Sequence, residues 1–272
     1  MRDDGIAAFY DEYGEREWER LDRDFHHRLE FEVTTDYLTG HLPESGHILD
    51  VGGGGGRYAV WLAERGYDVT LVDVSEQQVR IAREKAQEHG VEDRVTTQRV
   101  RELGVDGRFD ATLCLGGALS HVLDETERAT AVSELRRVTR PTAPVFVSVM
   151  GLLASVTRML RHAGKTDPDE TELLPELVAT GDYDRELVER YGQELSVQPM
   201  HLFRVDEFET LLEREFAVET LAALEGPFSQ RRDEQELLTD THRSAIRETL
   251  ASLREDRSVV DHSAHMLAVC RA

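Results

Sequence analysis

Five consecutive glycines, Gly52 to Gly56, follow a short apolar run that contains Asp50. Glycine has no Cβ, so such a run lets the backbone turn sharply and approach a ligand closely. A second apolar run ends near Asp73, whose carboxylate could accept hydrogen bonds from both hydroxyls of a ribose. The order of strand, glycine turn, helix and acid-tipped strand predicts a βαβ unit that holds a nucleoside. A merely flexible loop is the alternative, but a strand-like run enters the glycines and a helix-like run leaves them.

The glycine spacing distinguishes two kinds of nucleoside site. A dinucleotide fold prefers G-x-G-x-x-G, in which the third glycine packs helix against strand. That third position here holds Arg57 or Tyr58. The chain instead has the pattern D-x-G-x-G-x-G, formed by Asp50, Gly52, Gly54 and Gly56.

This pattern, the acid at position 73 and the later strands resemble the class I S-adenosylmethionine-dependent methyltransferases. The overall pattern is similar to the broad ubiquinone/menaquinone-biosynthesis-like group, and the resemblance runs roughly from Tyr10 to the C-terminus. It implies an α/β, Rossmann-like doubly wound sheet of seven strands in the order 3-2-1-4-5-7-6, with the last strand antiparallel and helices on both faces. It also implies a soluble enzyme that uses S-adenosylmethionine to methylate a small-molecule substrate.

Apolar runs alternate with helical patterns along most of the chain, which predicts a parallel sheet with right-handed crossovers. The expected strands are 47–51, 68–72, 94–98, 109–115, 145–150, 216–223 and 265–271. The expected helices are 57–65, 205–214 and 233–253, and two more that Ser75 and Asp124 cap and that end at about His89 and at Val138. We expect a single methyltransferase domain over 1–272, with a helical N-terminal cap at 1–42 and a helical, lid-like insertion at 151–204.

The chain is strongly acidic, with 54 acids against 32 bases and a net charge of −22. Such a surface repels phosphate backbones, so no nucleic acid is expected as a partner. Excess acid also keeps proteins soluble in concentrated salt, and we hypothesise a halophilic source. Equal unfolding midpoints in dilute and molar KCl would count against that hypothesis. The oligomeric state is not predicted, and a homodimer stays open.

No stretch of 18 uninterrupted apolar residues occurs, so no membrane-spanning helix is expected. Cys114 and Cys270 both lie in apolar runs, which predicts buried thiols in a reducing, cytoplasmic compartment rather than a disulfide.

The resemblance implies which residues touch the cofactor, because ligands of doubly wound sheets bind at the carboxyl ends of the strands. The predicted cofactor-binding residues are Tyr13, Asp50, Gly52, Gly53, Gly54, Asp73, Val74, Val100 and Leu115. Asp73 would hold the ribose, Asp50 would support the loop near the amino end, and the Leu115 carbonyl would receive the ammonium group. Alternatives stay open: Asp50 as a loop-tying acid, Asp73 as an exposed strand end, Val74 as core, and Tyr13, like Tyr10, as helix packing.

The chain departs from the family where an acid usually meets the adenine amino group. That position holds Arg99, and a guanidinium cannot accept a hydrogen bond. The backbone N–H of Val100 could contact the ring instead, or Glu102 could substitute if the loop is shifted.

Methyl transfer from a sulfonium requires mainly positioning and desolvation, with a base only if the acceptor must lose a proton. His121, just beyond the fourth expected strand, is the predicted catalytic residue, and a structural histidine that anchors the loop is the alternative. His201 is a second candidate base, and Arg158 and Arg204 could pair with an anionic acceptor. Neither CxxC nor HExxH occurs, and no metal is expected.

Two other functions stay open. An NAD-dependent oxidoreductase is disfavoured by the missing third glycine of the dinucleotide pattern. A non-catalytic S-adenosylmethionine-binding or regulatory homologue is made more plausible by Arg99.

Overall fold

The computed structural model of the chain describes residues 4–99, 104–165, 170–195 and 197–272. Within them, one seven-stranded sheet has the order β3-β2-β1-β4-β5-β9-β8. Its strands are β1 (His47–Val51), β2 (Asp68–Asp73), β3 (Val95–Arg99), β4 (Ala111–Cys114), β5 (Pro144–Met150), β8 (Ala217–Ala223) and β9 (His265–Arg271). Strands β1 to β5 are parallel, and β9 runs antiparallel to both neighbours. The expected sheet order is thereby confirmed.

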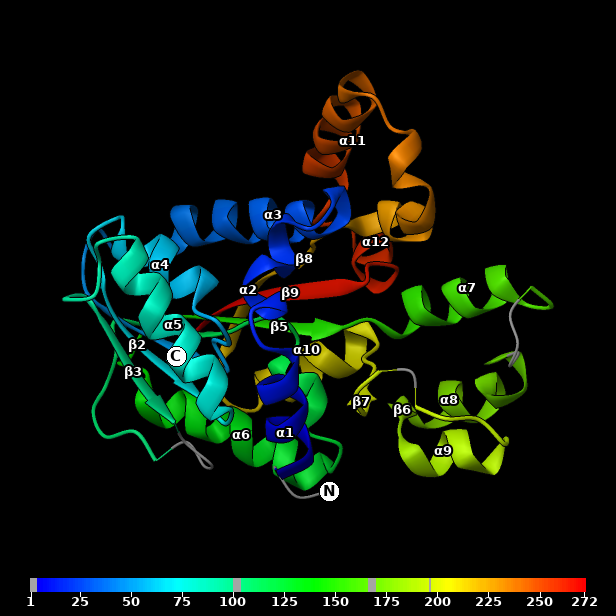
Figure 1. Cartoon of the computed structure of the whole chain (residues 1–272), viewed down its shortest axis with the longest axis horizontal. Coiled ribbons are helices and arrows are strands. Elements are labelled where there is room, and N and C mark those ends of the chain that lie inside the picture. The colour runs from blue at the N-terminus through cyan, green and yellow to red at the C-terminus, as the bar shows by residue number, and fades with distance from the viewer. Residues whose placement is uncertain (1–3, 100–103, 166–169, 196) are drawn as a thin grey trace.

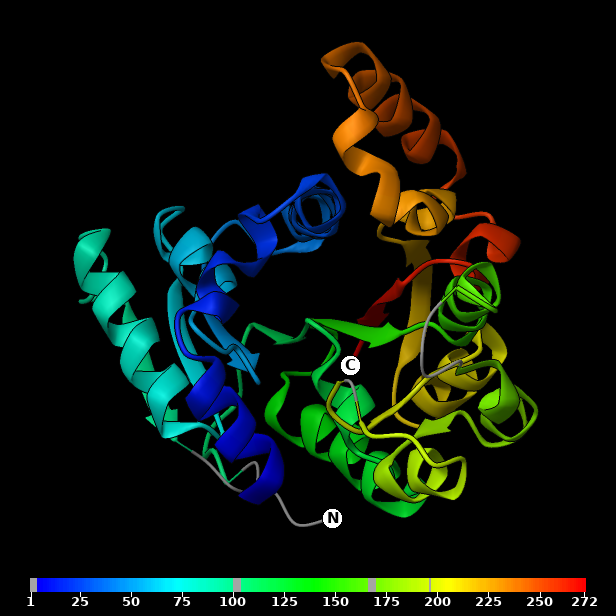
Figure 2. The ribbon, with the colours of Figure 1, turned by 45° about the vertical axis from the view of Figure 1, so that its right-hand side comes forward.

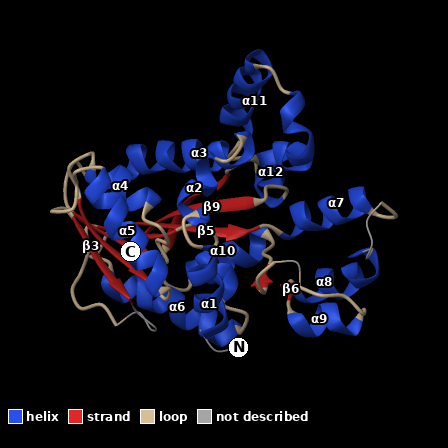
Figure 3. Ribbon diagram, viewed as in Figure 1, coloured by secondary structure: helices blue, strands red, loops and turns tan. Residues whose placement is uncertain are grey.

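Helices cover both faces of the sheet (Figures 1 and 3). The principal ones are α3 (Phe25–His41), α4 (Arg57–Ala63), α5 (Glu76–Glu88), α6 (Glu125–Val138) and α10 (Val205–Glu213). Figure 1 shows α3 and α4 above the strands and α6 and α10 below them.

Strand β9 shows why both faces must be covered. Leu267 and Val269 pack into the core beneath α3 and α4, whereas Met266, Ala268 and Cys270 pack into the core against α6 and α10. This alternation follows from the two-residue period of a strand. Cys114 and Cys270 are buried free thiols, as their apolar surroundings predicted.

Two predicted helix starts are confirmed by their capping bonds. The Ser75 hydroxyl accepts a hydrogen bond from the Gln78 N–H at 3.0 Å, and Asp124 accepts from Thr126 and Glu127 at 2.9 and 3.0 Å. Such side chains satisfy N–H groups that have no partner inside the helix.

The single helix expected over 233–253 is wrong. The structure has a 3₁₀ helix, η4 (Gly226–Leu237), followed by a separate α11 (Asp240–Leu253), and this pair projects from the sheet (Figure 2). The break occurs because Thr239 caps α11: its side chain accepts from the His242 N–H, while the His242 ring accepts from the Thr239 N–H. The short helix α12 (Arg257–Asp261) then leads to β9.

The segments expected as cap and insertion are mostly helical. The first contains α1 (Asp4–Tyr13), α2 (Arg16–Glu19), the 3₁₀ turn η1 (Arg20–Asp22) and α3. The second contains α7 (Leu152–His162), η3 (Glu170–Leu173), α8 (Leu174–Thr180) and α9 (Arg185–Arg190). It also contains an unpredicted antiparallel pair, β6 (Asp182–Tyr183) and β7 (Met200–His201). Among the described helices, none is long and apolar enough to cross a membrane.

Candidate active site

The loop between β1 and α4 turns at three glycines in the left-handed region. Gly52, Gly54 and Gly56 have φ angles of 66°, 53° and 87°, which residues with a Cβ rarely adopt. The Gly52 N–H donates to the Val72 carbonyl at 2.8 Å and so fastens the loop to β2. The backbone therefore requires glycine at the three alternate positions of the sequence pattern.

Gly53 is required by contact with its neighbours. A Cβ at this position would lie 2.6 Å from Oδ2 of Asp50 and 2.7 Å from Cδ1 of Leu71. Asp50 is 1% exposed, and its Oδ2 has no hydrogen-bond partner among the described residues. Burial, followed by the charge of Asp73, raises the pKa of Asp50 to about 7. Among the described residues, a buried carboxyl oxygen without a hydrogen-bond partner therefore lies directly beneath the loop, and such an atom favours a hydrogen-bond donor.

We expect Gly53→Ala to lower the free energy of unfolding by about 1–3 kcal/mol, because the added methyl group must displace Asp50 or Leu71. Urea unfolding would measure the change. Gly40→Ala is the matched control, since an added Cβ on this residue of α3 meets nothing within 4 Å. Equal loss of stability in the two variants would contradict the close contact at Gly53.

Asp73 lies at the tip of β2 and is 8% exposed. Its Oδ1 accepts from the Ser75 N–H and its Oδ2 from the Gly54 N–H, both at 2.9 Å. Burial raises the pKa of Asp73, although these backbone donors oppose the shift. Each oxygen keeps a second lone pair, so the carboxylate can hold the loop and still accept hydrogen bonds from a ribose.

Arg99 lies beside Asp73 in the register of β2 and β3. Its Nε donates to the Val74 carbonyl at 3.0 Å, and its Nη1 lies 3.6 Å from Oε2 of Glu76. The side chain therefore covers the strand tip and offers no acceptor to an adenine. Val74 is half-buried. Val100 and Glu102 lie outside the described residues, so their proposed contacts with adenine stay predictions.

Two further left-handed glycines follow β4. Gly116 and Gly117 have φ angles of 66° and 78°. A Cβ on Gly116 would lie 3.4 Å from Nη2 of Arg20, and one on Gly117 would lie 3.1 Å from Sδ of Met150. Leu115, immediately before them, is 4% exposed. The end of β4 thus brings bare backbone close to a cationic side chain on one side and a thioether on the other.

His121 lies in the 3₁₀ turn η2 (Ala118–His121) and is anchored through both ring nitrogens. Nδ1 lies 2.9 Å from the Pro199 carbonyl oxygen and must donate to it, so Nε2 accepts from the Tyr10 hydroxyl at 3.2 Å. Burial lowers the pKa of His121 and favours the neutral ring. This tautomer suits a base, and the same two contacts suit an anchor between α1 and the Pro199 loop.

Of the two N-terminal tyrosines, Tyr10 faces His121. Tyr13 stacks on Phe9, with ring centroids 5.4 Å apart, and the Arg16 guanidinium lies 4.6 Å above the Tyr13 ring. A contact between Tyr13 and the cofactor stays a prediction.

His201 is wrong as a candidate base. Its Nδ1 lies 2.6 Å from Oδ1 of Asp182 and its Nε2 lies 2.7 Å from Oε1 of Glu207, so both nitrogens are engaged by carboxylates. Arg204 is likewise engaged, through a forked pair of contacts to Asp261 at 2.7–3.0 Å. These side chains hold β7 and the start of α10 in place.

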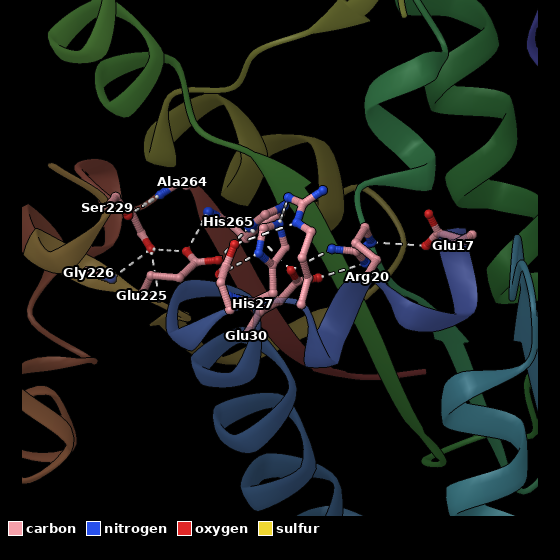
Figure 4. A network of polar contacts seen from close by, with 12 residues as sticks. Glu17, Arg20, His27, Glu30, Glu225, Gly226, Ser229, Ala264 and His265 are labelled. Carbon is pink, nitrogen blue, oxygen red and sulfur yellow. Dashed lines mark hydrogen bonds and ion pairs between the residues drawn. The ribbon is translucent and has the colours of Figure 1, made fainter. Parts of the chain in front are cut away.

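Figure 4 shows a buried polar network that the sequence did not predict. Its Arg20 side chain approaches Gly116, just after β4. Its main members are Glu17, Arg20, Glu30, Glu225 and His265. Arg20 donates to both oxygens of Glu30 at 2.7 and 3.0 Å and, through Nε, to Glu17 at 3.0 Å. Cγ of Glu17 lies 3.1 Å from the position of a Cβ on Gly54. The network therefore reaches from the glycine loop to the beginning of β9.

Part of the chain is similar to known methyltransferases. Residues 48–142 match a family model described as a methyltransferase domain. A ubiquinone biosynthesis O-methyltransferase of Xanthomonas axonopodis pv. citri is 33% identical over 121 residues, which are 43% of this chain and 49% of that protein. The chain spans about half the length of the curated relatives it matches.

Solved structures share the fold over a larger part of the chain. A SAM-dependent methyltransferase of Methanosarcina mazei has a TM-score of 0.57 at 19% identity, covering 86% of this chain and 96% of its own. Geranyl diphosphate C-methyltransferase of Streptomyces coelicolor A3(2) has a TM-score of 0.53 at 15% identity, covering 90% and 80%. With the sheet order, these likenesses show that the chain has the fold of the class I S-adenosylmethionine-dependent methyltransferases and that residues 48–142 are similar to a methyltransferase domain.

Proposed function

We propose that this protein transfers a methyl group from S-adenosylmethionine to a small-molecule acceptor. The observation that carries the proposal is the glycine loop, which turns through three left-handed residues between two buried carboxyl groups, Asp50 and Asp73. Bare backbone between two acids suits a ligand that has both a ribose and an ammonium group.

The residues of the site fit the separate parts of this cofactor. Asp73 would accept hydrogen bonds from the ribose, while Oδ2 of Asp50 and the Leu115 carbonyl would face the ammonium group. The carboxylate of the methionine part would lie near Arg20, whose guanidinium approaches Gly116. When bound, the cofactor supplies a methyl group made electrophilic by the sulfonium. The protein then has to hold the acceptor in line with the methyl group, exclude water and accept a proton if the acceptor must lose one.

The N-terminal helices support the exclusion of water, because they are fastened over the glycine loop. Gln78 of α5 donates to the carbonyls of Tyr10 and Gly14 at 2.9 Å. Asp11 accepts from the Ser75 hydroxyl at 2.5 Å. We propose that residues 1–42 cap the cofactor and that 151–204 shape the acceptor pocket.

The identity of the acceptor atom does not follow from the fold. The two similar enzymes named above methylate oxygen in one case and carbon in the other, according to their names. A surface of net charge −22 disfavours nucleic acids, so we propose a free metabolite of the cytoplasm as the acceptor.

Thermal unfolding with S-adenosylmethionine, S-adenosylhomocysteine and NAD tests the proposal. We expect the first two to raise the midpoint, because a ligand at 100 times its Kd stabilises the folded state by about 2.7 kcal/mol. Stabilisation by NAD alone would overturn the proposal. A labelled-methyl assay over a metabolite pool then separates an enzyme from a homologue that binds the cofactor without transfer.

A further inference from the structure

One histidine of the polar network lies at the carboxyl edge of the sheet and has been given no role in methyl transfer. Because β9 is antiparallel to β5, its first residue, His265, lies opposite Met150, the last residue of β5. Met150 in turn approaches Gly117 at the end of β4. His265 therefore lies two strands along from β4, on the side of the sheet edge away from the nucleoside loop.

The His265 ring is held by a buried carboxylate (Figure 4). Nδ1 lies 2.6 Å from Oε1 of Glu225, which is fully buried. The other oxygen of Glu225 accepts from the His265 N–H at 3.0 Å and from the Ser263 hydroxyl at 3.1 Å. Glu225 is thus fixed as a carboxylate, and Nδ1 carries the proton. Among the described residues no hydrogen bond engages Nε2, and the His265 side chain keeps 9% of its surface exposed.

The groups around His265 favour protonation of its ring. Oε2 of Glu30 lies 3.9 Å from Nδ1, and Arg20 lies beyond Glu30. The ring centroids of His26 and His265 lie 6.5 Å apart. The charge of His27 helps to lower the pKa of Glu30. Burial disfavours the charged imidazolium, but the carboxylates of Glu30 and Glu225 outweigh burial and raise the pKa of His265.

Glu30, Glu225 and His265 also lie close enough together to hold a metal ion. That interpretation is disfavoured because protein donors already use their ligand atoms. Arg20 covers both oxygens of Glu30, and the His265 ring and the Ser263 hydroxyl engage those of Glu225. The same contacts instead suit a histidine oriented by an acid, an arrangement in which the acid fixes the tautomer and stabilises the imidazolium.

We propose that His265, positioned by Glu225, is the base that accepts a proton from a hydroxyl group of the acceptor. This inference rests on the proposed methyl transfer. As the O–H bond of the acceptor breaks, its proton moves to Nε2. The electron pair left on oxygen forms the new bond to the methyl carbon, while the pair of the old carbon–sulfur bond stays on sulfur. The imidazolium, paired with Glu225 and Glu30, later releases its proton to water.

Substitution of His265 tests this role. Transfer of a labelled methyl group to catechol, protocatechuate and hydroquinone would be compared in wild type, His265→Gln and His262→Gln. His262 is the matched control, an exposed histidine three residues away whose ring bonds the Ser258 carbonyl. We expect His265→Gln to lower kcat by about 10²–10⁴-fold. We also expect His262→Gln to match wild type, and calorimetry to give one affinity for S-adenosylhomocysteine in all three proteins.

The pH profile distinguishes His265 from His121, whose pKa shifts in the opposite direction. If His265 is the base, the acid limb of kcat/KM lies above the ordinary histidine pKa of about 6.5. If His121 is the base, the limb lies below that value. Glu225→Gln, which keeps an oxygen for Nδ1 but removes the charge, is expected to move the limb to lower pH. Glu225→Gln also tests the role of His265 if the His265→Gln variant does not fold.

The outcomes separate this inference from the proposed function. No binding of S-adenosylhomocysteine by the folded wild type would overturn the proposed function itself. Binding without methylation of any hydroxyl probe would overturn the inference alone. Full transfer by folded His265→Gln, or an acid limb that Glu225→Gln leaves in place, would likewise overturn the role of His265.

Discussion

Replacing Asp73 with alanine is expected to weaken S-adenosylmethionine binding more than tenfold. Two hydrogen bonds from ribose hydroxyls to a charged carboxylate would be lost, each worth about 1.5–3 kcal/mol, and each 1.4 kcal/mol is a factor of about ten in affinity. The loop would also lose a fastening, because the Gly54 and Ser75 N–H groups donate to this same carboxylate. Isothermal calorimetry on the folded variant measures the affinity.

Two further variants give this experiment its controls. Asp68→Ala removes an exposed acid from the other end of β2, where it pairs with Arg94 at 3.1 Å, and should leave the affinity unchanged. Asp73→Asn keeps one acceptor oxygen and should give an intermediate loss. Unchanged affinity in Asp73→Ala would show that the ribose does not bind to Asp73 and that this carboxylate has only a structural role.

The glycine loop could be predicted because its constraints are local. The φ angles of Gly52, Gly54 and Gly56 belong to one short turn, and the acid that fastens it lies at the end of the next strand. Helix starts at Ser75 and Asp124 were predictable for the same reason, since each cap bonds an N–H two or three residues further along.

Features that depend on distant parts of the chain could not be predicted in this way. Nothing near Glu30 indicates that His265 will approach it, because 235 residues separate them and the contact forms only when α3 packs beside β9. The β6–β7 pair could not be predicted from the sequence either, because a strand of two residues gives no periodic pattern.

The choice between neighbouring candidates also required the fold. Tyr10 and Tyr13 are equally plausible in sequence, but the docking of α1 on α5 brings Tyr10 to His121. The sequence left His201 as a candidate base, but the β6–β7 pair and α10 bring Asp182 and Glu207 to its two ring nitrogens. No role was predicted for Glu17 and Arg20, although their spacing of three residues was a signal that they could pair.

The network gives the protein one connected set of alternating charges from the glycine loop after β1 to the beginning of β9. Glu17 lies against the glycine loop, Arg20 joins it to Glu30, and Glu30 and Glu225 flank His265. Each charge is compensated by its neighbours, which allows so many ionisable groups to be buried together. A substitution in the middle of this set should therefore lower the free energy of unfolding.

Arg20→Met is the second change for which we expect a large effect, a loss of about 3–5 kcal/mol in the free energy of unfolding. Glu30 is 1% exposed, and without the guanidinium its charge would be buried without its main partner. Urea unfolding measures the loss. Arg16→Met, at an exposed position of α2 four residues before Arg20, should change stability by no more than about 0.5 kcal/mol.

The pH dependence of stability gives a sharper test, because acid should lower the contribution of Glu30 to stability in wild type and raise it in Arg20→Met. In wild type, burial opposes ionisation of Glu30, but Arg20 and then His265 outweigh it and hold the pKa of Glu30 below its ordinary value. The stability that this carboxylate contributes is present above the unfolded pKa and is lost as pH falls through the lower, folded value. In Arg20→Met, burial should instead raise that pKa, so acidification protonates Glu30 in the folded state and recovers part of the stability.

Arg20→Met with Glu30→Leu, which leaves no buried charge at either position, should recover much of the loss at neutral pH. Parallel pH slopes for wild type and Arg20→Met would contradict the compensation of Glu30 by Arg20.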